Sequence, residues 1–177
     1  IRGGIRGVKG VKFMQMTVVL PYAVPGVIIA LSMILAFSQP IAGVRLYNTI
    51  WILLIAYIAR FMNLGYNNIS GAISQVDTSL EEAARISGAS QLRAFKDVML
   101  PLLKSSLISS FFLVVAPTIS ELSLSSLLWS VGNETIGTIV FSAKEEGRIL
   151  LTAAIAIILI ILVVFINLLV NSQTDKD

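Results

Sequence analysis

Four long apolar runs constrain this sequence more than any other feature. Each approaches the roughly 20 residues that an α-helix needs to cross the hydrocarbon of a bilayer. A soluble domain of 177 residues is too short to wrap that much apolar helix, and only helices or closed barrels can span lipid. Because the runs are continuous rather than alternating, they predict an all-α, polytopic membrane protein with four transmembrane helices. The runs are Thr17–Phe37, Thr49–Leu64, Leu102 to about Leu128, and Ile149–Val170.

The composition supports this class and excludes several kinds of site. Hydrophobic residues make up 56% of the chain and charged residues only 13%. The absence of cysteine and histidine excludes disulfides, thiolate or imidazole metal sites, cysteine nucleophiles and Ser-His triads within this chain. The net charge of +3 gives little support to a nucleic-acid partner, and anionic lipid headgroups explain the N-terminal cations. We therefore expect membrane lipid, and no nucleic acid, as a partner.

Basic residues are divided unevenly between the two sides that helix parity defines. The N-terminal tail, residues 65–101 and the C-terminal tail share one side, and residues 38–48 and 129–148 share the other. Only Arg45, Lys144 and Arg148 lie on the second side. The positive-inside tendency therefore places a linker at 1–16, a loop at 65–101 and a tail at 171–177 in the cytoplasm. The ten basic residues on or beside that side are Arg2, Arg6, Lys9, Lys12, Arg60, Arg85, Arg93, Lys96, Lys104 and Lys176.

Residues 65–101 are polar but carry the signals of folded structure. Overlapping Ser/Thr-x-x-Glu patterns at Thr78 and Ser79 predict the capped start of a short helix, which Gly88 ends. Ser90 can cap a second helix, and Pro101 marks the turn into the third apolar run. The apolar face of that second helix recurs at helical spacing at Leu92, Phe95, Val98, Met99 and Leu102.

The same loop resembles the EAA signature of ABC importer permeases. Three residues separate Glu82-Ala83-Ala84 from Gly88, and nine residues separate Gly88 from Val98. One further residue then precedes Leu100-Pro101. Val98 stands where the family most often has Ile, a swap that keeps the β-branched apolar character. Taken singly, Glu82 also reads as a capping carboxylate and Gly88 as a helix stop. The resemblance implies an ATPase-coupling role for Glu82, Ala83, Ala84, Gly88, Val98, Leu100 and Pro101.

This resemblance implies a MetI-like importer-permease fold and a division of labour between chains. The sequence has no Gly-x-x-x-x-Gly-Lys-Ser/Thr phosphate loop, so no cofactor is expected on this chain, and ATP and Mg would be used by a separate ATPase. The partners implied are a cytoplasmic ABC ATPase dimer, an extracytoplasmic substrate-binding protein and a second permease half, in the same chain or another. The chain would be a transport subunit of the bacterial inner membrane, not an enzyme. Residues 17–170 would be the later part of one six-helix half, and the start at Ile1 indicates a fragment.

Further stretches resemble the ferric-iron group of these permeases. They are LPYAVPG in the first run, YIARFMN in the second, and the segment from Glu121-Leu122-Ser123 to Glu146-Gly147. The resemblance implies iron(III) as substrate. The permeases for thiamine, phosphonate, polyamine and sulfate resemble the same group, so those substrates stay open.

Glu121 is the candidate pathway residue, because an ionisable side chain near the outer end of a span is expensive unless it faces protein or water. With Ser120, Ser123 and a kink at Pro117 it could line an outer gate and offer an oxygen ligand to a cation, although no fixed metal site is expected. The alternative is an interfacial carboxylate that caps a helix. Arg60 is expected to reach the cytoplasmic interface from the end of its run.

An intramembrane enzyme and a membrane scaffold are the two other functional classes for this sequence. An intramembrane enzyme would need paired catalytic groups inside the spans, and no second such group accompanies Glu121 in the sequence. A membrane scaffold that docks a cytoplasmic partner without transport is compatible with the loop motif. Substrate flux separates the scaffold from the transporter.

Overall fold

The computed structural model describes residues 9–174, and its regular structure there is helical apart from one isolated β-bridge between Ile41 and Val44. The prediction of an all-α protein is confirmed. Arg2, Arg6 and Lys176, which entered the charge argument, lie outside the described residues. The elements are α2 (Lys9–Ala23), α3 (Gly26–Phe37), α4 (Ile50–Gln75), α5 (Thr78–Ile86), α6 (Gln91–Ala94), the π-helix η1 (Phe95–Met99), α7 (Leu100–Leu102), α8 (Lys104–Ile119), α9 (Ser125–Leu128), α10 (Ile136–Glu145) and α11 (Ile149–Thr174).

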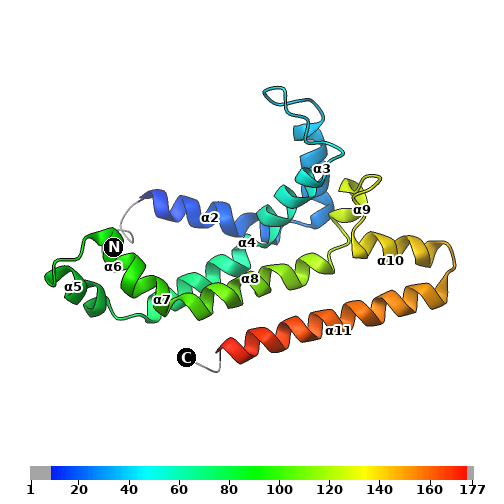
Figure 1. Cartoon of the computed structure of the whole chain (residues 1–177). Helices are drawn as coiled ribbons and strands as arrows, with labels where there is room; N and C mark the ends of the chain where they lie inside the picture. The colour runs from blue at the N-terminus through cyan, green and yellow to red at the C-terminus, as the bar shows by residue number, and fades with distance from the viewer. Residues whose placement is uncertain (1–8, 175–177) are drawn as a thin grey trace.

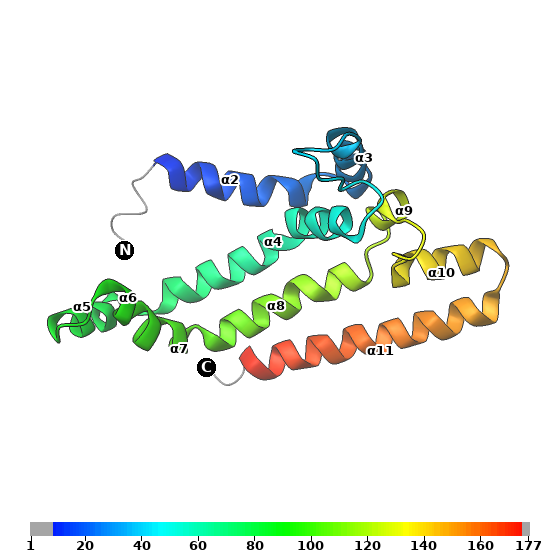
Figure 2. The same ribbon diagram turned by 45° about the horizontal axis from the view of Figure 1, so that its top comes forward.

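The long helices α4, α8 and α11 lie side by side and form the body of the molecule (Figures 1 and 2). Helices α5, α6 and α7 gather at one end of this body, and α9 and α10 gather at the other. Helix α2 packs along α4, whereas α3 projects across the direction of the body. The loop motif and the candidate gate therefore occupy opposite ends of the structure.

Within residues 9–174, two helices are long and apolar enough to cross a membrane. These are α4 and the Ile149–Val170 part of α11, and two bent helix pairs raise the number to four if each pair counts as one span. The pairs are Gln15–Ala23 with Gly26–Phe37, and Gln91–Leu102 with Lys104–Ile119. The predicted count of four spans is thus approximate, and the two additional candidates are bent.

The first apolar run, Thr17–Phe37, is sharply bent, because α2 and α3 meet at an angle of 113°. Pro25 has no N–H and favours an extended conformation in the residue before it. Its own backbone, at φ −55° and ψ 137°, is extended. The chain therefore turns at Val24 and Pro25 before α3 begins at Gly26.

The second and third runs also differ from their predicted bounds. Helix α4 continues for eleven residues past Leu64, to Gln75, and the polar stretch that follows Leu64 contains no proline to end it. At 26 residues it is about 39 Å long, which exceeds the hydrocarbon core. The third run does not form one helix to Leu128, since α8 ends at Ile119, two residues after Pro117, and α9 is separate.

Small and polar side chains let α4 and α8 approach closely. Gly65 is buried, and a Cβ added to it would lie 3.3 Å from the Val114 side chain and 3.8 Å from Ser110. The Asn68 amide donates to the carbonyl of Ser106 and to the hydroxyl of Ser110, at 3.1 and 3.0 Å. Small residues with interhelical hydrogen bonds are the usual means of helix association in lipid.

A separate apolar cluster holds α3, the start of α4 and α9 together. Its members are buried residues from all three helices, and they form the core nearest the candidate gate. They are Ile29, Ala30, Ile52, Leu53, Ala56, Leu124 and Leu128.

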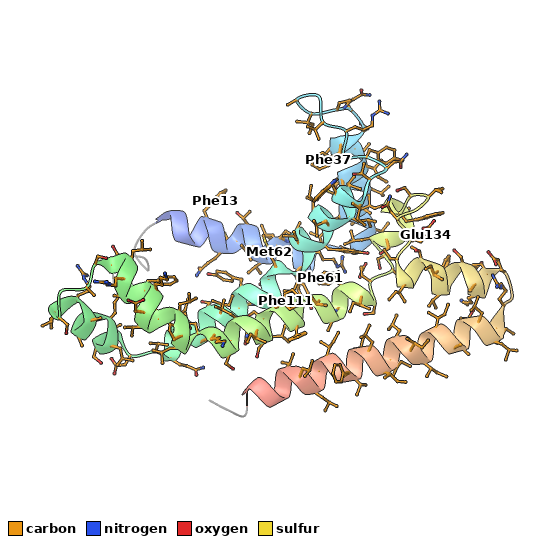
Figure 3. All side chains as sticks on the ribbon, viewed as in Figure 1. Phe13, Phe37, Phe61, Met62, Phe111 and Glu134 are labelled. Atoms are coloured by element: carbon orange, nitrogen blue, oxygen red, sulfur yellow. The ribbon has the colours of Figure 1, made fainter. Side chains whose placement is uncertain are left out.

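Helix α11 packs against α8 and α10 and leaves most of its apolar surface exposed. Side chains project from both of its sides (Figure 3). A helix that is apolar all round suits contact with lipid on its outer faces.

We expect Gly65→Val to lower the stability of the protein by about 1–3 kcal/mol, because the added methyl groups overpack the α4–α8 contact. Gly71→Val is the matched control on the same helix, since a Cβ at Gly71 meets nothing within 4 Å. Thermal unfolding in detergent micelles measures both. Equal midpoints for the two variants would contradict the close contact at Gly65.

Candidate functional site

Helix α5 begins one residue earlier than the Ser/Thr-x-x-Glu patterns predicted. Asp77 is its N-cap, and the Asp77 carboxylate accepts a hydrogen bond of 2.9 Å from the Ser79 backbone N–H. Thr78 is already the first helical residue, so the prediction of capping boxes at Thr78 and Ser79 is wrong. A carboxylate also complements the positive end of the helix dipole, which favours Asp at this position.

The end of α5 follows the prediction at Gly88. This glycine has φ +89°, and the N–H groups of Gly88 and Ala89 donate to the carbonyls of Arg85 and Ala84, each at 3.0 Å. This pair of bonds is a Schellman motif, which needs a left-handed residue that glycine supplies without a Cβ clash. The prediction that Gly88 ends the helix is confirmed.

The second helix of the loop is interrupted. Ser90 caps α6 as predicted, with its hydroxyl accepting from the Arg93 N–H at 3.3 Å. The next turn, Phe95–Met99, is π-helical, and a bend of 66° at Leu103 separates the stretch Gln91–Leu102 from α8. Single π-turns often occur at functional positions, and this one adjoins the predicted turn at Pro101.

The loop helices expose apolar side chains at the end of the molecule. No residue of α5 is buried, and the Ile86 and Leu92 side chains are 87% and 77% exposed. The predicted apolar face of the second helix is only partly covered, since Leu92, Phe95 and Leu102 are exposed whereas Val98 and Met99 are half-buried. Among the motif residues, Ala84 and Val98 are half-buried, and Glu82, Ala83, Gly88, Leu100 and Pro101 are exposed.

Glu121 stands at the opposite end, where α8 stops. One oxygen of its carboxylate accepts from the Leu124 backbone N–H at 2.8 Å, and its carbonyl accepts from the Ser125 hydroxyl at 2.8 Å. The side chain therefore caps the turn that leads into α9, the role that the sequence left as its alternative. The backbone here is crowded, since a Cβ on Gly137 of α10 would lie 2.9 Å from the Glu121 carbonyl oxygen.

Tyr57 connects this turn to α4. Its hydroxyl forms a hydrogen bond with the hydroxyl of Ser125, which is fully buried. Tyr57 also packs on the apolar cluster shared by α3, α4 and α9. Tyr57 therefore packs between helices and has a polar partner 68 residues away along the chain.

The four predicted pathway residues do not share one surface. Pro117 and Ser120 line a cleft of about 270 Å³ against Val163 and Asn167 of α11. Ser123 lies instead beside Gly26, at the start of α3, where a Cβ on Gly26 would be 2.8 Å from the Ser123 Cβ. Glu121 is directed to its capping contact between these two places.

Arg60 lies in the interior of α4, because this helix continues to Gln75. Its Nη1 donates to the Val24 carbonyl at 3.2 Å, and its guanidinium lies 5.6 Å from the Phe61 ring centre. The sequence signal for this position is a charged side chain within an otherwise apolar run. That Arg60 reaches the cytoplasmic interface stays a prediction.

The residues around Glu121 do not by themselves make a metal centre. Among residues 9–174, no three His, Cys, Asp or Glu side chains are grouped closely enough to hold a metal ion.

Comparison with known proteins adds a family match over nearly the whole chain. The family described as "Binding-protein-dependent transport system inner membrane component" matches residues 5–175. A permease protein of Salmonella paratyphi A, named for 2-aminoethylphosphonate transport, is 30% identical over 154 residues. That alignment covers 87% of this chain and 57% of the relative, so the chain spans little more than half of that protein's length.

Two further relatives are named for different substrates. The putrescine transport system permease protein of Escherichia coli (strain K12) is 29% identical over 82% of this chain and 51% of the relative. The ferric transport system permease protein of Actinobacillus pleuropneumoniae is 27% identical over 95% of this chain and 24% of the relative.

We expect Asp77→Ala to destabilise α5 by about 0.5–2 kcal/mol, because it removes the acceptor for the Ser79 N–H. Thr78→Ala is the matched control, and it should have little effect since Thr78 is not the cap. Hydrogen exchange of the α5 backbone amides measures the difference. Faster exchange in Thr78→Ala than in Asp77→Ala would restore the capping boxes that the sequence predicted.

Proposed function

Because the chain belongs to the family of binding-protein-dependent transport system inner membrane components, we propose that it forms part of the permease of an ATP-driven importer. In this proposal it contributes to a transmembrane pathway and opens it alternately to the two sides of the membrane. It carries out no bond chemistry. The substrate arrives on an extracytoplasmic binding protein, and a second permease half completes the pathway.

The observation that carries this proposal is the exposed helix–turn–helix of α5, α6 and η1. Its apolar side chains at Ile86 and Leu92 are largely exposed, at the end of the molecule away from α9 and α10. A polar loop that folds into two capped helices and leaves apolar residues exposed is suited to enter a groove on another protein. The residues that would transmit the motion are Glu82, Ala83, Ala84, Gly88, Val98, Leu100 and Pro101.

The docking partner we propose is a cytoplasmic ABC ATPase dimer. ATP and Mg would be bound there, since the chain has no phosphate-binding loop. In this assignment residues 1–16 and 171–177 lie in the cytoplasm, and 17–170 form the membrane domain. Residues 65–101 are the coupling loop of that domain and also lie in the cytoplasm. Because α4 extends to Gln75, its last turns would project from the membrane and carry the coupling helices.

The substrate we propose is a small ionic solute, with ferric iron as the hypothesis from sequence resemblance. Relatives named for ferric, putrescine and 2-aminoethylphosphonate transport all align with most of this chain, so phosphonate and polyamine remain the main alternatives, followed by thiamine and sulfate. Glu121, with Ser120, Ser123 and Pro117, is proposed to shape the outer gate.

Crosslinking tests the coupling role, and the chain has no native cysteine to interfere. In the full-length permease, Ala89→Cys should crosslink to a cysteine introduced into the groove of a co-expressed ATPase, in a manner that changes with ATP. Glu82→Lys in the same background should weaken both the crosslink and the dependence of uptake on ATP hydrolysis, with the protein still in the membrane. A folded permease that gives no crosslink would favour the scaffold and remove the coupling assignment.

Glu121→Ala should reduce uptake more than it reduces the amount of protein in the membrane, if the carboxylate serves the gate as well as the turn. Glu121→Gln is the matched variant, because its amide oxygen can still accept from the Leu124 N–H. Uptake of radiolabelled solute by proteoliposomes, with membrane abundance measured alongside, gives the comparison. Parallel loss of uptake and abundance in both variants would make Glu121 structural only.

A further inference from the structure

Arg60 carries a permanent positive charge into the interior of α4. Ten residues of α4 precede Arg60, starting at Ile50, and fifteen follow it, ending at Gln75. Its guanidinium cannot lose its proton in a protein, so burial cannot neutralise it. Charged side chains at such depth are expensive and usually have a function.

The partner of Arg60 is a backbone group that the first helix break leaves without its helical partner. In a continuous helix, the Val24 carbonyl would accept from the N–H of Ile28, but that N–H bonds to Pro25 instead. Arg60 Nη1 takes the place of this donor at 3.2 Å. The positive charge also lies at the C-terminal end of α2, which is the negative end of the helix dipole.

The second helix break meets the first at the same point. A Cβ added to Gly26 would lie 2.7 Å from Arg60 Nη1 and 2.8 Å from the Ser123 Cβ. Gly26 therefore has no room for a side chain, because Arg60 and the segment between α8 and α9 close around it. Ser123 is two residues from Glu121, whose carboxylate caps the same turn.

One donor of Arg60 is unused. Its Nε is buried and has no hydrogen-bond partner within the described part of the chain. A buried N–H without a partner is rare in native proteins, and it leaves the guanidinium with a bond to form if the neighbouring segments move.

We propose that Arg60 is a positioning residue of the outer gate, holding the α2–α3 bend against the α8–α9 break. The description of this region as a gate rests on the proposed function, whereas the contact between Arg60 and Val24 does not depend on it. When the guanidinium holds Val24, α3 and α9 stay packed through their shared apolar cluster. When it changes partner, the two broken helices can separate, and the turn at Glu121 moves with α9.

The test uses a reporter that lies away from Arg60, so that a smaller side chain at position 60 does not itself open a path to the probe. Leu128 of α9 is 2% exposed and belongs to the apolar cluster. In the full-length permease assembled with its ATPase, Leu128→Cys should react slowly with a water-soluble thiol reagent. Adding Arg60→Gln should raise the reaction rate at least about tenfold, which corresponds to about 1.4 kcal/mol easier separation of α9 from α3.

Two comparisons make the result specific. Arg45→Gln, which alters an exposed arginine of the loop before α4, should leave the rate unchanged. Arg60→Lys keeps the charge but loses the planar arrangement of donors, so its rate should fall between those of arginine and glutamine. If Arg60→Gln does not accumulate, a rate above wild type in Arg60→Lys still supports the proposal, and a wild-type rate overturns it.

Hydrolysis of ATP by the same assemblies separates positioning from stability alone. A gate that no longer holds should let Arg60→Gln hydrolyse ATP with less dependence on the binding protein. Lower heat stability with an unchanged labelling rate and unchanged ATP hydrolysis would mean that Arg60 only stabilises the fold. If the unmodified protein transports no solute, the proposed function fails, whereas the labelling rates still decide the role of Arg60.

Discussion

Every backbone N–H and C=O that lies in lipid must find its partner inside the protein, and this requirement governs the structure. Unbroken helices such as α11 meet it without help. The breaks at Pro25 and after Pro117 do not, because each leaves carbonyl or amide groups outside the helical pattern. Side chains supply the missing partners: Arg60 donates to Val24, and the Glu121 carboxylate accepts from Leu124.

The same requirement explains why the two breaks lie together. A polar group at one break is cheaper to bury when the other break offers further polar neighbours, and α4 provides the surface between them. Tyr57 and Arg60 lie one helical turn apart on α4, and they reach Ser125 and Val24 respectively. The side chains of one helix thus contact both irregular segments. The apolar cluster then fixes α3 and α9 against it.

Local signals in the sequence predicted the helical class and much of the loop motif. Apolar runs predict the membrane helices because contact with lipid requires only an apolar composition. The turn at Gly88 is predictable because its left-handed conformation favours glycine. Pro25 is a local signal for a break in the helix, but the angle of the bend depends on packing against α4 that no local pattern encodes. The cap at Asp77 was missed because a capping pattern one residue later looked equally suitable. The interior position of Arg60 in α4 was missed because the second run was predicted to end at Leu64, where the composition changes, although the helix continues to Gln75. The contacts of Arg60 with Val24 and of Tyr57 with Ser125 join residues tens of positions apart, so they emerged only from the fold.

Helix α11 has a consequence for where such a protein can reside. Its apolar segment of 22 residues would span about 33 Å if it stood upright, and it touches the rest of the chain mainly through α8 and α10. Because so much of its surface faces outward, many apolar substitutions in α11 would be tolerated, whereas a change in its length would not. A thinner bilayer would have to be met by tilting α11, and because α10 and α8 adjoin it, that tilt would reach the turn at Glu121. Bilayer thickness is thus a physical variable to which this fold is sensitive.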